Sequence, residues 1–228
     1  MSLEKLTLVI PAKNEDESLP LVLEELKIYK VNTIVIIPRD DLKTFEAVKK
    51  FDCKIIFQEK AGYGAAIIEG LNNSQSEYSC IFNADGSFQP SDLNKMYNLL
   101  EDRNEKLDFI FNSRYIGSGG SDDDTILTKI GNFFFTNLCN LLFKTNASDV
   151  LYTYVMGKTK CFIENKLKCN DFTLCVELVI SAKRNSQKYF FLNSYERSRL
   201  KGKKKVNEFK DGFLILIYML KQFFRHKK

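Results

Sequence analysis

Short apolar runs rich in β-branched residues alternate with helical patterns over the first half of the sequence, and this alternation most constrains the fold. Four segments of helical length and periodicity separate five runs of strand character. Strands that alternate with helices at this spacing predict a mostly parallel sheet with helices on its faces. The expected strands are Leu6–Ile10, Thr33–Ile37, Cys53–Phe57, Tyr78–Asn83 and Leu107–Asn112, and the expected helices are Glu17–Tyr29, Leu42–Phe51, Tyr63–Asn72 and Ser91–Leu100.

The regular alternation ends after residue 112. The polar segment Gly117–Asp124, with three glycines and three consecutive aspartates, is either a surface loop or a lid over a ligand. We interpret the chain as one α/β domain over residues 1–211, followed by an amphipathic, basic helix over residues 212–228. The further elements expected are a long apolar helix over Thr125–Phe143, a strand near Val150–Met156, a helix near Phe172–Lys183 and a strand over Lys188–Leu192.

Positive charge is concentrated at the end of the chain. Residues 197–228 hold 11 Lys and Arg against two acids, a net charge of +9, whereas the other 196 residues carry −4. The apolar segment Phe213–Phe224 lies among these basic residues. A solvated run of charge is the ordinary explanation, but basic residues beside an apolar helical face suit an anionic membrane surface better than nucleic acid.

The expected location is therefore the cytoplasmic face of a membrane, with the protein attached peripherally. The apolar run Phe213–Leu220 is far shorter than the roughly 20 residues that a spanning helix needs. The first residues run directly into a strand pattern and show no secretory signal. The cysteines form no CxxC pair and the single histidine is His226, which argues against a zinc site.

Four segments have the composition of a ligand site, and in an open parallel sheet ligands bind outside the carboxyl ends of the strands. An aspartate beside a glycine, as at Asp85, can bind a hard cation such as Mg²⁺ or Mn²⁺, although a plain Asx-Gly turn explains the same residues. Gly62 and Gly64 allow a ligand to approach a helix start, but their spacing matches neither a dinucleotide fingerprint nor a P-loop. The segments are Pro11–Ser18, Glu59–Ala66, Asn83–Ser87 and Arg197–Lys205.

Taken in this order, the segments resemble family-2 glycosyltransferases of the GT-A fold, and within them the polyprenyl-phosphate (dolichol-phosphate) mannose and glucose synthases. The resemblance covers roughly Leu6–Gly212. It rests on Pro11-Ala12-Lys13-Asn14-Glu15 for the Pro-Ala-x-Asn-Glu motif, Asn83-Ala84-Asp85-Gly86-Ser87 for the Asp-x-Asp metal motif, Ser113-Arg114-Tyr115, Gly131-Asn132, and Tyr195–Lys205 for the Arg-x-x-Gly-x-Ser-Lys segment.

The resemblance implies a set of site residues. The donor-binding residues are Pro11, Ala12, Asn14, Glu15, Asp40, Asp41, Gly62, Gly64, Asn83 and Ala84. The residues for Mg²⁺ or Mn²⁺ are Asp85, Asn83 and Ser87. The residues for the acceptor or its phosphate are Asn132, Arg199 and Lys205, and the catalytic residues are Asp85, Arg114 and Glu177.

The sequence departs from the family pattern at three places. The first carboxylate of the metal motif is the amide Asn83, so Asp85 must supply the negative charge at the metal. The segment after the second strand reads Pro38-Arg39-Asp40-Asp41 where the family often has Asp-Asp-Gly-Ser. The family's Thr-Ser-Gly-Phe stretch reads Thr153-Tyr154-Val155-Met156.

The expected reaction is a metal-assisted, inverting transfer of a sugar from a UDP- or GDP-sugar to a polyprenyl phosphate. A phosphate acceptor is already an anion, whereas a hydroxyl acceptor needs a general base, for which Glu177 and Asp171 are the obvious residues. Two alternatives stay open, namely transfer to a glycan hydroxyl and a degenerate homologue that binds nucleotide without catalysis. The sequence leaves open the sugar, the base and the oligomeric state.

Overall fold

The structure is a computed structural model that describes residues 3–202 and 207–225. Its helices are α1 (Leu19–Leu26), η1 (Lys27–Tyr29), α2 (Leu42–Val48), α3 (Tyr63–Asn72), α4 (Asp92–Glu101), α5 (Ile126–Phe143), α6 (Thr159–Glu164), α7 (Leu174–Arg184) and α8 (Glu208–Arg225). Its strands are β1 (Leu6–Pro11), β2 (Asn32–Pro38), β3 (Lys54–Gln58), β4 (Tyr78–Ile81), β5 (Phe109–Ser113), β6 (Gly120–Ser121), β7 (Val155–Lys158), β8 (Tyr189–Asn193) and β9 (Tyr195–Glu196).

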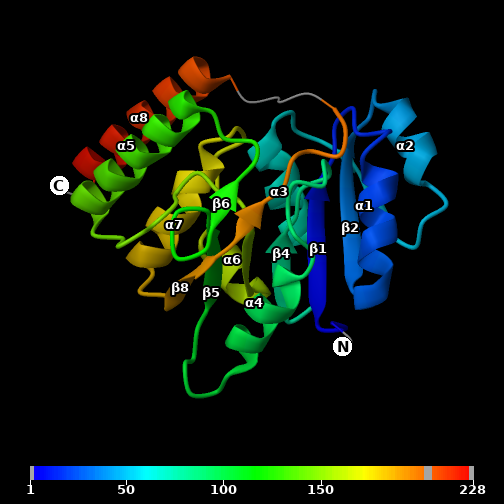
Figure 1. Cartoon of the computed structure of the whole chain (residues 1–228), viewed down its shortest axis with the longest axis horizontal. Helices are drawn as coiled ribbons and strands as arrows, with labels where there is room; N and C mark the ends of the chain where they lie inside the picture. Colours follow the sequence, from blue (N-terminus) through cyan, green and yellow to red (C-terminus); the bar gives the residue numbers. More distant parts are fainter. Residues whose placement is uncertain (1–2, 203–206, 226–228) are drawn as a thin grey trace.

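Seven of these strands form one sheet in the order β3-β2-β1-β4-β7-β5-β8 (Figure 1). Strand β7 runs antiparallel to β4 and β5, and the other pairs in the sheet are parallel. The predicted α/β fold with a mostly parallel, helix-flanked sheet is therefore confirmed. The order reverses at β1, which has β2 on one side and β4 on the other, so the carboxyl ends of β1 and β4 border the crevice where such sheets bind ligands.

The sheet is apolar on both faces, as its continuous hydrophobic runs predict. In β1, Leu8 and Ile10 pack into a cluster with α1, α2 and α4, whereas Val9 packs into a second cluster with α3, α6 and α7. Both clusters consist of side chains that are almost fully buried. The packing on both faces holds the sheet in place, and with it the ends of the strands that carry the loops.

The second half of the chain departs from expectation at several elements. The strand expected near Val150–Met156 begins at Val155, because the preceding residues form an irregular buried segment that starts with Asp149, whose carboxylate binds Arg114 and Asn132. Helix α6 was not predicted. The polar segment Gly117–Asp124 contains strand β6, which pairs with β9 in a small second sheet.

Helices α5 and α8 lie side by side at one end of the molecule (Figure 1). Helix α5 starts at the capping box formed by Thr125 and Thr128. Helix α8 starts at Glu208, so the expected boundary between residues 211 and 212 falls inside this helix, whose Ile215 and Met219 are buried in the core of the main body. The division into two parts stays a prediction.

Replacing Gly70 of α3 by Ala tests the packing of helix on sheet. A Cβ atom at Gly70 would lie 2.4 Å from Val9 Cγ1 and 2.6 Å from Ile36 Cδ1. Overpacking lowers the free energy of unfolding by about 1–3 kcal/mol, and the better helix propensity of Ala offsets up to about 1 kcal/mol of this loss. We expect Gly70→Ala to lower the free energy of unfolding in urea by roughly 1–2 kcal/mol.

Gly131 of α5 is the matched control, because a Cβ atom there would meet nothing within 4 Å. We expect Gly131→Ala to raise the free energy of unfolding by up to about 1 kcal/mol through helix propensity alone. Equal stability of Gly70→Ala and the unsubstituted protein would contradict the packing described here.

Candidate active site

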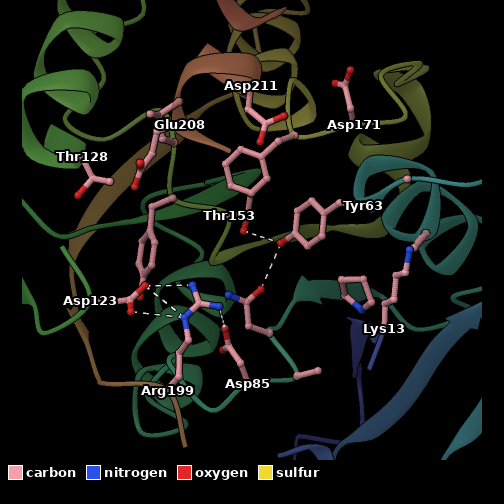
Figure 2. A pocket seen from close by; sticks show the side chains of 18 of the residues that line it. Lys13, Tyr63, Asp85, Asp123, Thr128, Thr153, Asp171, Arg199, Glu208 and Asp211 are labelled. Carbon is pink, nitrogen blue, oxygen red and sulfur yellow. Dashed lines mark hydrogen bonds and ion pairs between the residues drawn. The ribbon is translucent and has the colours of Figure 1, made fainter. Parts of the chain in front are cut away.

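A cavity of about 670 Å³ opens at the carboxyl ends of β1, β2 and β4, where the order of the sheet reverses. Pro11 lines it at the end of β1 and Ala12 directly after that strand, Asp40 lines it after β2, and Asn83 and Asp85 line it after β4. Its far side is formed by α5 and α8, and Figure 2 shows the charged and polar side chains around it. Three strand-end segments that are distant in sequence therefore meet in one cavity, with Ala84 also on its wall.

The loop after β1 is braced from the loop after β2. Glu15 lines the cavity, but Asn14 and Asp41 are not among its lining residues. The Asn14 backbone, which has a φ of 50°, donates its N–H to the Asp41 carboxylate, and that carboxylate also accepts the Thr44 N–H at the start of α2. In this structure Asn14 and Asp41 therefore support the loop after β1 from outside the cavity, and Asp40 is the residue after β2 that faces the cavity.

The glycines at the start of α3 make room for another part of the chain. A Cβ atom at Gly62 would lie 2.1 Å from the Asn170 carbonyl oxygen, and one at Gly64 would lie 2.2 Å from that of Cys169. The Ala65 N–H at this helix start donates to the Asn170 carbonyl. Gly62 lines the cavity and Gly64 does not. The close approach expected for a ligand is thus a close approach of the segment before α7.

The turn after β4 is held by its own polar groups. The Asp85 carboxylate accepts the Ser87 N–H at 3.0 Å, and the Asn83 amide donates to the Ser87 hydroxyl at 3.4 Å. Tyr63 donates its hydroxyl to Asn83 Oδ1 at 3.2 Å, and burial raises the pKa of this tyrosine so that it keeps its proton. Ser87 is 1% exposed and does not line the cavity, so it shapes the turn rather than facing a ligand.

Arg199 places a positive charge between two carboxylates on the cavity wall. Its guanidinium Nη1 lies 3.2 Å from Asp85 Oδ2, and its Nη2 lies 3.0 Å from Asp123 Oδ2 (Figure 2). Burial on its own lowers the pKa of Arg199, but the hydrogen bond to Asp123 and the charge of Asp85 raise it. Asp123 was not among the predicted site residues, although the run of three aspartates was the signal that pointed to it.

Arg114 is buried in a network of carboxylates. Its Nε lies 2.8 Å from Asp149 Oδ2, and its Nη1 lies 3.0 Å from Glu196 and 3.5 Å from Asp124. Asn132 of α5 donates to the other oxygen of Asp149 at 2.6 Å. The network joins the end of β5, the polar segment before α5, α5 itself and β9.

Burial and charge shift the pKa of Arg114 and of Glu196 in this network. Burial lowers the pKa of Arg114 on its own, but attraction to Asp149 and Glu196 raises it well above its ordinary value. Burial raises the pKa of Glu196, opposed by Arg114 and by the Ser121 hydroxyl. Arg114 lines the cavity and directs its side-chain hydrogen bonds to protein carboxylates, which gives it a structural role; its expected catalytic role stays a prediction.

Between α5 and α8 the cavity has an apolar strip of four side chains, beside the carboxylates of Glu208 and Asp211 in the first turn of α8. Helix α5 contributes Leu127 and Phe135, and α8 contributes Phe209 and Ile215. Asn132, expected to bind the acceptor, lines this part but donates its amide to Asp149. The cavity thus continues from a charged end at Asp85 and Arg199 into an apolar arm between two helices.

Three carboxylates, those of Asp171, Glu208 and Asp211, line the cavity away from Asp85 (Figure 2). Glu208 and Asp211 belong to the first turn of α8, and Asp171 lies in the segment before α7. Lys13, from the loop after β1, supplies a further positive charge on the wall. Glu208, Asp211 and Lys13 were not assigned to the site from the sequence.

The sequence model described as Glycosyl transferase family 2 matches residues 7–164, from β1 through α6. This range contains the strand ends that meet in the cavity. The chain belongs to this family. The family and the enzyme class predicted from the motifs are confirmed, and the GT-A fold with them.

Related sequences are distant. An uncharacterized glycosyltransferase of Mycobacterium tuberculosis is 30% identical over 97 residues, which span 42% of this chain and only 44% of that relative. A UDP-N-acetylglucosamine–dolichyl-phosphate N-acetylglucosaminyltransferase of Methanococcus voltae is 24% identical over 204 residues, which span 78% of this chain and 80% of the relative.

Solved structures of other glycosyltransferases share the fold. The glucosyl-3-phosphoglycerate synthase of Mycobacterium tuberculosis has a TM-score of 0.73 at 12% identity, over 96% of this chain and 80% of the synthase. The mannosyl-3-phosphoglycerate synthase of Rubrobacter xylanophilus has a TM-score of 0.70 at 10% identity, over 97% of this chain and 74% of that one. At these identities the likeness establishes the fold of this glycosyltransferase and leaves its substrates to other arguments.

Glu177, expected as a catalytic residue, lies outside the cavity lining. Its carboxylate accepts the backbone N–H groups of Lys168 at about 3 Å and of Cys169 at 2.8 Å. It therefore fastens the segment before α7, and Asp171 is the carboxylate of this region that faces the cavity. Lys205, expected to bind a phosphate, lies outside the described residues.

The oxygen atoms at the charged end of the cavity fit a hard cation. Asp85 offers a carboxylate and Asn83 an amide oxygen, both ligands that Mg²⁺ and Mn²⁺ accept. Asp85 pairs with the cationic Arg199 through Oδ2, and a cation bound at that oxygen would displace this contact. Among residues 3–202 and 207–225, no three His, Cys, Asp or Glu side chains converge as a ready metal site.

The structural role of Arg114 predicts a loss of stability on its replacement. Arg114→Gln leaves Asp149 and Glu196 buried without their cation, and breaking a buried pair in this way costs about 3–5 kcal/mol. Arg199→Gln is the matched comparison, because the Arg199 side chain is 21% exposed against 10% for Arg114, and we expect the smaller loss there. Urea unfolding measures the free energy of unfolding of both variants. Equal decreases in the two would contradict the structural role of Arg114.

Proposed function

We propose that this glycosyltransferase moves a sugar from a UDP- or GDP-sugar to a polyprenyl phosphate, with inversion and with help from Mg²⁺ or Mn²⁺. We propose further that it does so at the cytoplasmic face of a membrane. The observation that carries the proposal is the shape of the cavity, whose charged end continues into an apolar arm between α5 and α8. A polyprenyl phosphate has the same two parts, an anionic head and an apolar chain.

Two relatives support parts of this proposal. The Methanococcus voltae relative is named for transfer to dolichyl phosphate, which is a polyprenyl-type phosphate. The Mycobacterium tuberculosis synthase was crystallised with Mn²⁺ and UDP-glucose. The first supports the acceptor class, and the second supports a nucleotide-sugar donor used together with a divalent cation.

The proposed reaction needs no general base from the protein, because the acceptor phosphate is already an anion. An oxygen of the acceptor phosphate forms a bond to the anomeric carbon while the bond from that carbon to the donor diphosphate breaks, so direct displacement inverts the centre. Asp85, with Asn83, would hold the divalent cation, which neutralises the charge that grows on the diphosphate. Arg199, which lies beside Asp85, would bind phosphate oxygens through its planar guanidinium.

Transfer from radiolabelled UDP- and GDP-sugars, with Mn²⁺ or Mg²⁺ and a short polyprenyl phosphate, tests the function. We expect label in the lipid phase, and Asp85→Asn should lower kcat about 100-fold or more because charge stabilisation at the leaving group is lost. The matched control is Asp122→Asn, since Asp122 is exposed, binds the Tyr195 hydroxyl and does not line the cavity. Full activity of Asp85→Asn in the presence of the metal would contradict the proposal that Asp85 holds the divalent cation.

The second candidate function is transfer to a hydroxyl acceptor, favoured by the position of Asp171 on the cavity wall. The phosphoglyceric acid bound to the Mycobacterium tuberculosis synthase is an example of a small, phosphorylated acceptor in the same fold. A hydroxyl acceptor needs a carboxylate base, and general base catalysis contributes about 10²–10⁴-fold.

Asp171→Asn separates the two functions. Because a phosphate acceptor needs no base, we expect kcat for polyprenyl phosphate to change by less than about threefold. A loss of about 100-fold, together with label that reaches a glycan or a small phosphorylated acceptor rather than lipid, would favour the hydroxyl acceptor. Donor binding without turnover on any acceptor would instead support a non-catalytic homologue.

A further inference from the structure

The outer face of α5 exposes an unusual amount of apolar surface. Ile130 is 63% exposed, Phe133 is 74% exposed, and Phe134 and Leu141 are also exposed. They recur at helical spacing and so form a stripe along the helix that none of the described residues covers. An exposed apolar patch of this kind marks an interaction site.

Helix α8 extends this apolar surface. It lies beside α5, and its exposed apolar side chains are Phe209, Phe213, Leu220 and Phe224. More than half of the large exposed hydrophobic side chains in the described part of the chain belong to these two helices. We call the outer side chains of α5 and α8 the two-helix face.

The charges on the two-helix face are mainly basic. The acids of these helices are Glu208 and Asp211, and both line the cavity. The other charged side chains of the two helices are Lys129, Lys210, Lys221 and Arg225, which are exposed and have no ion-pair partner among the described residues. Glu208 is also exposed, but the four basic side chains outnumber it, and an apolar surface with an excess of basic charge complements a bilayer with anionic headgroups.

The inner side of α5 is bonded to the rest of the protein, which argues against a position across a membrane. By length and composition it is the single helix in the described ranges that could span a membrane. However, Asn132 binds Asp149, Thr136 accepts the Val150 N–H, and Asn140 binds the backbone of Ala147. These bonds fasten α5 to the catalytic body and leave only its outer stripe for lipid.

We infer that the two-helix face docks the enzyme on an anionic bilayer, with α5 contributing as much as α8. This inference rests on the proposed function and deepens it, because it orients the active site. Leu127 and Phe209 belong both to the exposed face and to the apolar arm of the cavity. The arm therefore opens toward the bilayer, and an acceptor lipid reaches Arg199 without leaving the membrane.

Flotation with vesicles that contain no polyprenyl phosphate tests the docking by itself. We expect the full chain to bind vesicles of phosphatidylcholine and phosphatidylglycerol at least about tenfold more strongly than vesicles of phosphatidylcholine alone, with binding that weakens as salt rises. Equal binding to both, or none to either, would overturn the inference.

Matched substitutions separate the contribution of each helix. Phe133→Glu on α5 and Phe224→Glu on α8 should each weaken vesicle binding about tenfold, since each removes an apolar anchor and adds a negative charge. Ile28→Glu is the control, because Ile28 is 75% exposed but lies on η1, outside the two-helix face. Weaker vesicle binding by Phe224→Glu together with unchanged binding by Phe133→Glu would contradict the role of α5.

Two further measurements distinguish a failure of the docking inference from a failure of the proposed function. With a short, water-soluble polyprenyl phosphate, Phe133→Glu should transfer sugar at the unsubstituted rate, because Phe133 does not line the cavity. Vesicle binding without any transfer would count against the proposed function and leave the docking intact. A stable dimer by light scattering that Phe133→Glu dissociates, with no vesicle binding, would assign the face to a second copy and overturn the inference.

Discussion

The architecture around the cavity depends on one buried cation. The Arg114 guanidinium joins Asp149, Glu196 and Asp124, which come from three separate parts of the chain after the regular βα units end. Removing four charged groups from water is costly, and only their mutual attraction and hydrogen bonds make the arrangement stable. Because Asn132 binds the same Asp149, the position of α5 is tied to the same network.

The first half of the fold could be predicted because its information is local. Apolar runs of strand length, separated by amphipathic segments, indicate parallel βα units whichever residues lie elsewhere. The segment from Asp149 to Tyr154 was less predictable, because its apolar residues have strand character while its backbone follows the bonds of Asp149 to Arg114 and Asn132. Such bonds join residues more than 15 positions apart, and no local pattern reveals them.

The site residues divide in the same way, into those that local motifs predict and those that depend on contacts distant in sequence. Asp85 and Arg199 could be assigned from motifs, and the structure brings them within 3.2 Å of each other. Motifs also assigned roles to residues that support the site from behind, such as Asp41, Glu177 and Ser87, because a residue type at a motif position does not tell which way its side chain points. The apolar arm was missed, since it needs two helices that are separated by 64 residues between the end of α5 and the start of α8.

The placement of Arg199 has a thermodynamic consequence. The Asp85 carboxylate already has a counter-ion within the protein, so a divalent cation that binds it competes with a charge that is covalently attached and always present. A nucleoside diphosphate changes this balance, since it offers the displaced guanidinium a new anionic partner. If Asp85 holds the cation as proposed, cation and nucleotide would each increase the affinity for the other by the same factor, as linkage requires, and the cation alone would bind weakly.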